Sequence, residues 1–349
     1  MVHPELIGFG PFFSSQLSLE ELQSSLVGRA VADRGPSLLV RFPDGVHPVV
    51  VPGRLRAEGV LPVVGDFVVA SAGSERTVAR VLERRTWLSR NVAGGATAEQ
   101  VLAANVDVVF IVQGLDEGPN PRRLERTLAA VHAGGAEPVI VLTKPDRAED
   151  LAAALAEARA AAPGVEVEVA SGLTREGVSA LAARLRPDRT GVLVGPSGAG
   201  KSTLTNALLG HAAQRTAPVR AADDRGVHTT SRRELFPLPG GGALVDGPGI
   251  RELRLWDASG LDATFEDLAA IAARCRFRDC SHAAEPGCAV REAIAEGRID
   301  AARVESHRKL TLELARQAER RAGSAARVER ERWKGVAKEI RRMYRDRWR

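Results

Sequence analysis

Apolar and polar residues alternate with two different periods along the 349-residue chain. Between residues 27 and 91, short apolar runs at 37–41, 46–51 and 67–70 are separated by glycine, proline and aspartate, a texture typical of a small β-barrel. Beyond residue 107, apolar runs of strand length alternate with segments of helical periodicity, which predicts a parallel sheet covered by helices. The pattern therefore predicts a barrel followed by an α/β domain.

Individual elements follow from the same pattern. Residues 93–105 are small and polar, and are predicted to connect the barrel to the α/β region. At the N-terminus, Ser18 and Glu21 have the spacing of a capping box, which predicts a short helix within residues 14–26. The remaining predicted strands are 107–113, 138–142, 165–170, 190–194 and 243–245, and the predicted helices are 121–132, 150–161, 204–209, 262–273 and 301–316.

The strand at 190–194 runs directly into a glycine-rich turn that fits the phosphate-loop pattern at every required position. Glycines allow backbone N–H groups to surround phosphates, and the helix that follows presents its positive end to them. Lys201 is predicted to reach the β- and γ-phosphates, and Ser202 to place its hydroxyl on Mg²⁺. The predicted nucleotide contacts of this turn are Gly195, Ser197, Gly198, Ala199, Gly200, Lys201, Ser202 and Thr203.

Two further segments lie at the carboxyl ends of predicted strands, where open α/β sheets bind ligands. Residues 143–146, Thr-Lys-Pro-Asp, resemble the guanine-specificity motif of the Ras-like GTPase superfamily, and Ser171-Gly172 resembles the loop that follows it. The Asp146 carboxylate can accept hydrogen bonds from both N1–H and the exocyclic amine of guanine, a pair that adenine does not offer. The predicted guanine-side contacts are Thr143, Lys144, Asp146, Ser171 and Gly172.

The segment from Asp246 to Gly249 is similar to the Asp-x-x-Gly segment that holds Mg²⁺ through water and offers a glycine N–H to the γ-phosphate. Gly249 is therefore a predicted nucleotide contact. The polar loop at 226–230 precedes this segment, and its Thr230 is predicted to bind Mg²⁺ when GTP is present. The magnesium site would use Ser202, Thr230 and Asp246.

These motifs occur in a permuted order, because the guanine motif precedes the phosphate loop and both switch segments follow it. In this order the chain resembles the ribosome small-subunit-dependent GTPase A family, known as RsgA or YjeQ, from about residue 26 to its end. The resemblance implies an N-terminal OB barrel, a circularly permuted Ras-like P-loop GTPase domain and a C-terminal zinc-binding helical domain. It also implies a role in late maturation of the small ribosomal subunit.

The expected divisions of the chain are an N-terminal extension at 1–25, the barrel at 26–92, the GTPase domain at 93–254 and the zinc-binding domain with a basic C-terminal helix at 255–349. Many members of the family lack the first segment, whose role the sequence does not indicate. Many also have asparagine where this chain has Thr143.

The hydrolytic step is the part that the motifs define least. Ras-type enzymes position the attacking water with a glutamine directly after the Asp-x-x-Gly segment, where this chain has Ile250. An aliphatic side chain cannot orient water by hydrogen bonding, so we expect slow intrinsic turnover, and the resemblance implies stimulation by the ribosomal subunit. His228 is the candidate for the missing role, because it precedes the switch threonines and imidazole titrates near neutral pH. The predicted catalytic residues are therefore His228, Lys201 and Thr230. Contact between His228 and ribosomal RNA is the open alternative.

All three cysteines of the chain, Cys275, Cys280 and Cys288, gather around His282 with the spacing C-x4-C-x-H-x5-C. Three thiolates and one imidazole suit tetrahedral Zn²⁺, and four protein ligands favour a structural ion over a catalytic one. Zinc would fold a short loop that lacks a core of its own. The family resemblance points to the same four residues.

The formal net charge of +5 is unevenly distributed. Residues 320–349 hold twelve Lys/Arg against four Asp/Glu, a balance of +8, so the rest of the chain is slightly acidic. Such a terminus favours a phosphate-rich partner, although a solvated amphipathic helix gives the same pattern. The predicted partners are the small ribosomal subunit, its rRNA and GTP or GDP. Without a signal-peptide pattern or a membrane-spanning apolar stretch, we expect a cytoplasmic protein that binds no membrane. We also expect a monomer, although the sequence does not fix the oligomeric state.

Two other classes of protein stay open at this point. An ATP-using P-loop enzyme, such as a kinase, would make Asp146 incidental and would bind ADP more tightly than GDP. An RNA-binding assembly factor, in which GTP is mainly a structural or regulatory ligand, would release no phosphate even with small subunits.

Overall fold

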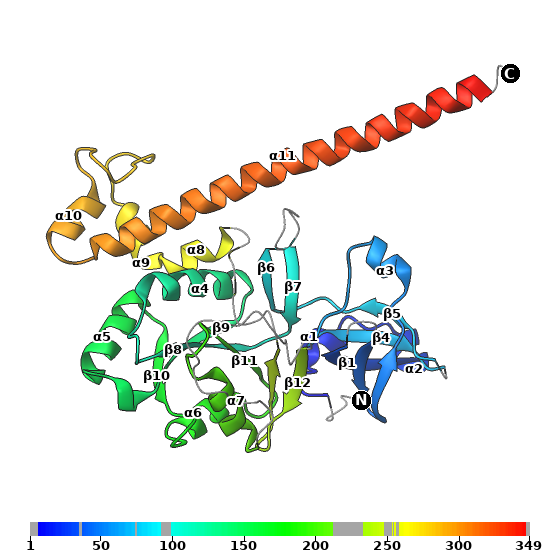
Figure 1. Cartoon of the computed structure of the whole chain (residues 1–349), viewed down its shortest axis with the longest axis horizontal. Coiled ribbons are helices and arrows are strands. Elements are labelled where there is room, and N and C mark those ends of the chain that lie inside the picture. The colour runs from blue at the N-terminus through cyan, green and yellow to red at the C-terminus, as the bar shows by residue number, and fades with distance from the viewer. Residues whose placement is uncertain are drawn as a thin grey trace, which may run out of the picture.

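The computed structural model describes residues 6–34, 37–73, 75–91, 99–211, 233–247, 253, 255 and 258–346. The chain forms a barrel, a central α/β domain and a helical module that continues into one long C-terminal helix (Figure 1). The central domain lies between the other two parts. This arrangement follows the order of the elements along the sequence.

The central domain is built on a sheet with the strand order β10-β9-β8-β11-β13-β12, in which only β12 runs antiparallel to its neighbour. Every residue of β8 is buried, because helices cover both faces of the sheet. The strands are β8 (Val108–Gly114), β9 (Glu137–Thr143), β10 (Glu166–Ala170), β11 (Thr190–Val194), β12 (Arg233–Pro237) and β13 (Ala243–Asp246).

Two apolar cores hold helices against this sheet. On one face, α4 (Pro121–Ala133) and α5 (Leu151–Ala161) cover β8 and β9 with residues such as Leu124 and Leu128. On the other face, α6 (Val178–Ala183) and α7 (Lys201–Leu209) pack through Leu181, Leu204 and neighbouring side chains. The predicted alternation of strands and helices is confirmed, while α6 and β12 were not predicted.

The N-terminal barrel has five strands, of which β1 pairs with both β2 and β4, β2 with β3, and β4 with β5. An isolated bridge between Val50 and Thr77 brings the ends of β3 and β5 together and closes the barrel. A short helix, α3 (Gly53–Ala57), lies between β3 and β4 in sequence, so the order matches the predicted OB type. The strands are β1 (Ser25–Asp33), β2 (Leu38–Phe42), β3 (Gly45–Val49), β4 (Phe67–Ser71) and β5 (Val78–Val81).

The segment before the barrel is packed onto it. Two short helices, α1 (Pro11–Ser14) and α2 (Leu19–Ser24), precede β1, and the predicted capping box between Ser18 and Glu21 starts α2. Phe9 and Phe13 are buried against Phe67 of the barrel, with ring centroids 5.3 and 4.4 Å from that ring. This N-terminal segment therefore adds a small apolar core to the outside of the barrel.

The barrel joins the central sheet through a short antiparallel ladder, in which Ala32 and Asp33 of β1 pair with Glu234 and Arg233 of β12. A separate hairpin, β6 (Trp87–Asn91) with β7 (Glu99–Ala104), lies between the two domains in sequence. The segment predicted as a connector contains β7, a strand that was not predicted. Its alanines are buried, and they gave no strand signal because alanine is a weak strand former.

The C-terminal module contains α8 (Ser259–Thr264), α9 (Glu266–Ala272), α10 (Ala289–Ala295) and α11 (Ala301–Asp346). The single helix predicted at 262–273 was wrong, because the backbone leaves the helical region at Phe265 (φ −118°, ψ 34°). The helix predicted at 301–316 begins where expected and continues for 46 residues, away from the body of the molecule (Figure 1).

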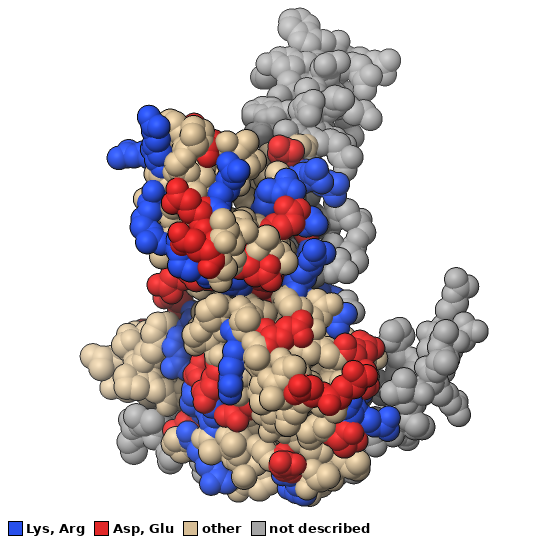
Figure 2. Space-filling view, turned by 90° about the vertical axis from the view of Figure 1, so that its left-hand side faces the viewer, with Lys and Arg blue, Asp and Glu red and all other residues tan. Residues whose placement is uncertain are grey.

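The face that carries α10 above α5 shows Lys/Arg and Asp/Glu side chains interspersed over both the zinc-binding module and the central domain (Figure 2). The excess positive charge of the sequence is therefore not gathered on this face. Among the residues that the structure describes, none of the helices combines the length and the apolarity needed to cross a membrane.

Candidate functional site

The phosphate loop connects β11 to α7, as predicted. Gly195 has a positive φ of 142°, and a Cβ at this position would lie 2.2 Å from the carbonyl oxygen of Val112, so only glycine fits against β8. Lys201 begins α7 and is 7% exposed; its Nζ donates to the carbonyl oxygens of Gly195 (2.8 Å) and Pro196. The ammonium therefore lies inside the turn that would surround the phosphates.

The guanine motif touches this loop directly. Thr143 ends β9, and its hydroxyl donates to the carbonyl oxygen of Ala199 in the phosphate loop (2.6 Å) while lying 3.2 Å from that of Gln113. Thr143 is 3% exposed, so this bond is protected from water. The Thr143 hydroxyl thus braces the phosphate loop from the end of β9.

Lys144 and Asp146 follow Thr143 at the surface of the same pocket. Lys144 has a left-handed backbone (φ 58°), and its ammonium forms an ion pair with Asp116, which comes two residues after β8. The hydrogen bond from Lys144 lowers the pKa of the Asp116 carboxyl, so Asp116 is charged at neutral pH. The Asp146 side chain is 66% exposed, with Arg147 Nε 3.4 Å from its carboxylate.

The Ser171-Gly172 turn is held from two sides. Ser171 N–H donates to the carbonyl oxygen of Glu176, and Ser171 Oγ accepts from Thr174 N–H. A Cβ at Gly172 would lie 2.7 Å from the backbone nitrogen of Leu204. The turn therefore presses against the first turn of α7, and glycine is required for that approach.

These segments enclose one pocket of about 550 Å³. It brings together seven residues predicted to bind the nucleotide, from segments up to sixty residues apart in the sequence. Sequence reasoning missed three of its members, Asp116, Arg147 and Leu173, because a charged or exposed residue after a strand has no distinguishing pattern. The lining residues are Asp116, Thr143, Lys144, Asp146, Arg147, Ser171, Gly172, Leu173, Gly200 and Thr203.

The predicted magnesium ligands can be placed only in part. Ser202 lies in the first turn of α7, which follows β11, and Asp246 ends β13. Because β11 and β13 are parallel neighbours in the sheet, their carboxyl ends lie side by side. The Asp246 carboxylate accepts from Gly247 N–H (2.6 Å). The other predicted switch residues, His228, Thr230, Gly249 and Ile250, lie outside the residues that the structure describes.

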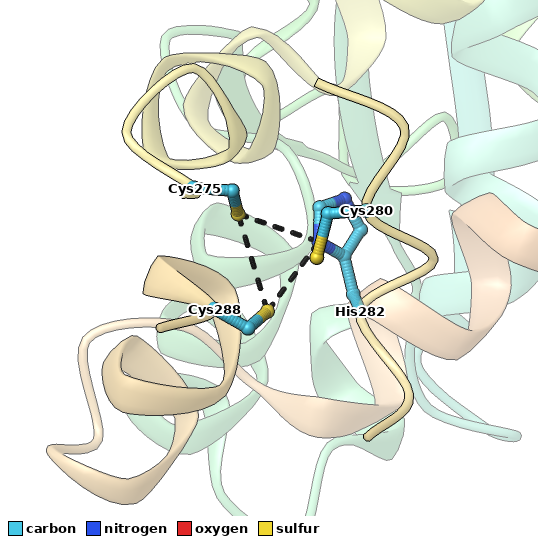
Figure 3. A group of neighbouring side chains, drawn as sticks. All are labelled: Cys275, Cys280, His282 and Cys288. Carbon is cyan, nitrogen blue, oxygen red and sulfur yellow. Dashed lines mark hydrogen bonds between the residues drawn. The ribbon is translucent and has the colours of Figure 1, made fainter. Parts of the chain in front are cut away.

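The second candidate site is the cysteine cluster of the C-terminal module (Figure 3). Cys275 follows α9, Cys288 precedes α10, and Cys280 and His282 lie on the loop between them. One ligand atom from each of the four lies within 4.8 Å of the others. The Sγ atoms of Cys275 and Cys288 are 4.0 Å apart, and His282 Nδ1 lies 3.6 and 3.5 Å from them.

These distances fit a zinc tetrahedron. Zn–S bonds of about 2.3 Å at the tetrahedral angle give S···S edges of about 3.8 Å. The loop is shaped for the site by Glu285, whose carboxylate accepts from the N–H groups of Ser281, Ala283 and Ala284. Hydrogen bonds from the Ser281 hydroxyl and from backbone N–H groups, that of Ser281 first, lower the pKa of Glu285 to about 2. The cluster could hold one zinc ion, which agrees with the predicted cofactor.

The family model described as RsgA GTPase matches residues 81–256. A protein of Methanosarcina acetivorans named small ribosomal subunit biogenesis GTPase RsgA is 43% identical over 321 residues, which cover 91% of this chain and 87% of that protein. The chain belongs to the RsgA GTPase family. A relative of the same name from Opitutus terrae is also 43% identical and covers 95% of both chains.

Solved structures of similar proteins show the same fold. The crystal structure of YjeQ from Thermotoga maritima has a TM-score of 0.62 and 23% identity, and the match covers 83% of this chain and 99% of that one. YloQ, described as a circularly permuted GTPase, has a TM-score of 0.61 and 23% identity, with coverages of 84% and 96%. The predicted fold class and its permuted order are confirmed, and the protein is a GTPase of the RsgA family, for which Mg²⁺ accompanies GTP.

Proposed function

We propose that the protein hydrolyses GTP to GDP and phosphate, and acts in late maturation of the small ribosomal subunit, to which it binds. The observation that carries this proposal is the contact of the guanine motif with the phosphate loop, made by the Thr143 hydroxyl on the Ala199 carbonyl. Relatives that are 43% identical carry the name small ribosomal subunit biogenesis GTPase.

In this proposal each part of the pocket has one task. Asp146, which is exposed at the pocket rim, reads the two N–H groups of guanine. Lys201 exchanges its two carbonyl partners for the β- and γ-phosphates of the nucleotide. Ser202, Thr230 and Asp246 would hold Mg²⁺, which neutralises charge that develops on the phosphates during hydrolysis.

Turnover should be slow in the isolated protein, because Ile250 stands where a water-orienting glutamine occurs in Ras-type enzymes. We infer that the ribosomal subunit completes the catalytic arrangement, with His228 as the residue that positions water. The rRNA is the proposed contact of the basic terminus, where residues 320–349 carry a balance of +8. We further expect a monomer that acts in the cytoplasm.

The test is GTP turnover by the purified protein with and without small ribosomal subunits, with ATP as the control nucleotide. We expect slow release of phosphate from GTP, clear stimulation by subunits, and no turnover of ATP. Asp146→Ala should reduce the preference for GDP over ADP by at least about a hundredfold, because its carboxylate makes a bond pair that adenine cannot make. Glu149→Ala is the matched control, since Glu149 is an exposed acidic residue of the same loop outside the pocket lining.

Several outcomes would contradict the proposal. Tighter binding of ADP than GDP would indicate an ATP-using enzyme. Absence of phosphate release even with subunits would leave an RNA-binding factor with GTP as a ligand. Stimulated turnover that is unchanged in His228→Ala, at intact subunit binding, would remove only the role given to that histidine.

A further inference from the structure

The N-terminal segment at residues 6–24 contacts more of the molecule than the barrel that follows it. Phe9 is buried in an apolar cluster with Phe67 on the outside of the barrel. Ile7 packs against a different core, the large one that continues from Val31 of the barrel to Val192 of the central sheet. Nearby side chains of this segment therefore enter two separate cores.

The backbone at Gly8 lies directly against the central domain. Gly8 has a positive φ of 78°, and a Cβ at this position would lie 3.3 Å from the carbonyl oxygen of Asp188 and equally close to Nη1 of Arg29. Asp188 comes two residues before β11, the strand that leads into the phosphate loop. Both the backbone conformation and the space around it therefore favour glycine.

The buried side chain of Arg29 fastens this part of the segment. Its guanidinium donates to the carbonyl oxygens of Ile7 in the N-terminal segment (2.7 Å), Gly65 in the barrel (3.3 Å) and Asn105 just before β8 (3.0 Å). One cation thus connects three parts of the chain. If the segment were lifted away, Arg29 would lose one of these acceptors and the cover that Gly8 gives it.

The other end of the N-terminal segment is fixed where the chain leaves the barrel. The Glu21 carboxylate accepts two hydrogen bonds from Arg80 of β5, of 2.7 and 2.9 Å. The side-chain oxygen of Gln16 accepts from the N–H of Glu83 (2.7 Å), which lies on the connection from β5 to β6. The segment is therefore anchored at both of its ends, and its first part spans the boundary between the two domains.

The remaining contacts between the barrel and the central sheet are short. The ladder between β1 and β12 has two residue pairs, both at the ends of their strands. Gly65 adds one close approach, since a Cβ there would lie 1.9 Å from the carbonyl oxygen of Ala104. A few residues at the ends of elements are typical of a hinge, and domains joined in this way move unless further contacts oppose the motion.

We propose that residues 6–24 act as a strap that holds the barrel and the central domain in one orientation, so that the two meet the small ribosomal subunit as one rigid body. The second half of this statement rests on the proposed function. A partner of that size can contact several domains at once, and its affinity falls when those domains must first be ordered. The strap touches the end of β11 opposite the phosphate loop, so nucleotide binding should not depend on it.

Gly8→Val in the full-length protein tests the proposal, because a branched side chain would meet the Asp188 carbonyl and would be strained at positive φ. Hydrogen exchange should become at least about tenfold faster in β12 and at the end of β1. Exchange in β2 and β4 of the barrel should stay as in the wild type.

Gly10→Val is the matched control. Gly10 lies on the same segment with an extended backbone (φ −134°), and a Cβ there would meet no heavy atom within 4 Å beyond its chain neighbours. This variant should exchange like the wild type. Ile7→Ser, which removes an apolar contact but keeps the carbonyl oxygen that Arg29 binds, should change exchange in the same direction as Gly8→Val and by less.

Binding of GDP and of small ribosomal subunits is measured on the same variants. Gly8→Val should bind GDP like the wild type and should bind subunits about three- to tenfold more weakly. Gly10→Val should leave both affinities unchanged.

The proposal is overturned if Gly8→Val and Gly10→Val exchange alike. Loss of protection throughout β2 and β4 would also overturn it, because the segment would then belong to the fold of the barrel itself. Faster exchange in β12 with unchanged subunit affinity would show that the orientation does not matter for binding, and would overturn it as well. Failure of the proposed function is a different result, in which the wild-type protein itself binds no subunits.

Discussion

The central domain is joined to its two neighbours by buried arginines that are stabilised in opposite ways. Toward the barrel, Arg29 of β1 is 2% exposed, and within the described part of the chain its hydrogen bonds go to neutral carbonyl oxygens, those of Ile7, Gly65 and Asn105. Burial lowers the pKa of Arg29 to about 10 and outweighs the opposing effect of the Asp107 and Asp66 charges, yet the cation is retained at neutral pH.

Toward the zinc-binding module, Arg303 of α11 is 6% exposed and forms ion pairs with Glu125 of α4 and Asp267 of α9. It also donates to the carbonyl oxygens of Ala161 and Thr264. Burial alone would lower the pKa of Arg303, but its hydrogen bonds and ion pairs with the carboxylates of Asp267 and Glu125 outweigh the effect of burial. The pKa of Arg303 is therefore raised. One side chain thus connects four helices and the end of α5.

The two junctions differ because the barrel and the zinc-binding module contact the central domain through different elements. The barrel shares backbone hydrogen bonds with the central sheet through β1 and β12, so its position does not depend on side chains alone. In the described residues, the zinc-binding module shares no strand with the sheet. It docks by helix packing, most closely where a Cβ at Gly260 would lie 1.8 Å from the Ala129 carbonyl oxygen. Its junction therefore depends on correctly folded helices and on paired charges.

Removal of zinc should have the largest effect, and this effect should be confined to the zinc-binding module. Chelation is expected to unfold the loop from Cys275 to Cys288 and to loosen α9 and α10, because structural zinc contributes about 10 kcal/mol or more to small modules of this kind. Hydrogen exchange should show a loss of protection in these two helices and unchanged protection in β1 and β8. Equal loss of protection in the barrel would mean that the two junctions are not independent.

Loss of Arg303 should be the next largest effect. Arg303→Met leaves Glu125, which is 2% exposed, as an uncompensated buried charge, so we expect a decrease of about 3–5 kcal/mol in the free energy of unfolding. Chemical denaturation measures this change in the free energy of unfolding. Adding Glu125→Gln should recover part of the loss, because the stranded charge is then absent.

Arg308→Met is the control for that substitution, since Arg308 lies on the same helix but is exposed, and its ion pair in the described structure is with the exposed neighbour Glu305. It should change stability by less than about 1 kcal/mol. A similar loss for Arg303→Met and Arg308→Met would show that the charge network at Arg303 does not hold the module.

Local motifs made much of this molecule predictable from sequence. The phosphate loop and the Cys/His cluster depend on residues close together in the chain, so spacing alone identifies them, and the alternation of apolar runs gives the strands of the central sheet. The capping box at Ser18 and Glu21 is equally local. Each of these elements is specified by residues that lie at most thirteen positions apart in the chain.

Features that depend on distant contacts were not predictable. The strand β12 begins with Arg233 and Glu234 and ends in Pro237, so it has no apolar run, and only its pairing with β13 and β1 defines it. The break at Phe265 lies within a continuous helical pattern and has no proline or glycine to mark it. Asp116 is part of the nucleotide pocket only because β8 and β9 are neighbours in the sheet.

Loss of Arg29 should have the smallest effect of the three, and it tests the comparison most directly. Arg29→Met leaves three carbonyl oxygens without this donor, but it leaves no hydrogen-bonded carboxylate without its partner. It also removes a cation that is costly to bury. We expect a decrease of about 1–3 kcal/mol in the free energy of unfolding, below that of Arg303→Met. Arg41→Met, on the neighbouring strand at a half-buried position opposite Arg29, is the control. If Arg29→Met were as destabilising as Arg303→Met, neutral carbonyl groups would hold a buried guanidinium as firmly as carboxylates do, and the contrast between the two junctions would be lost.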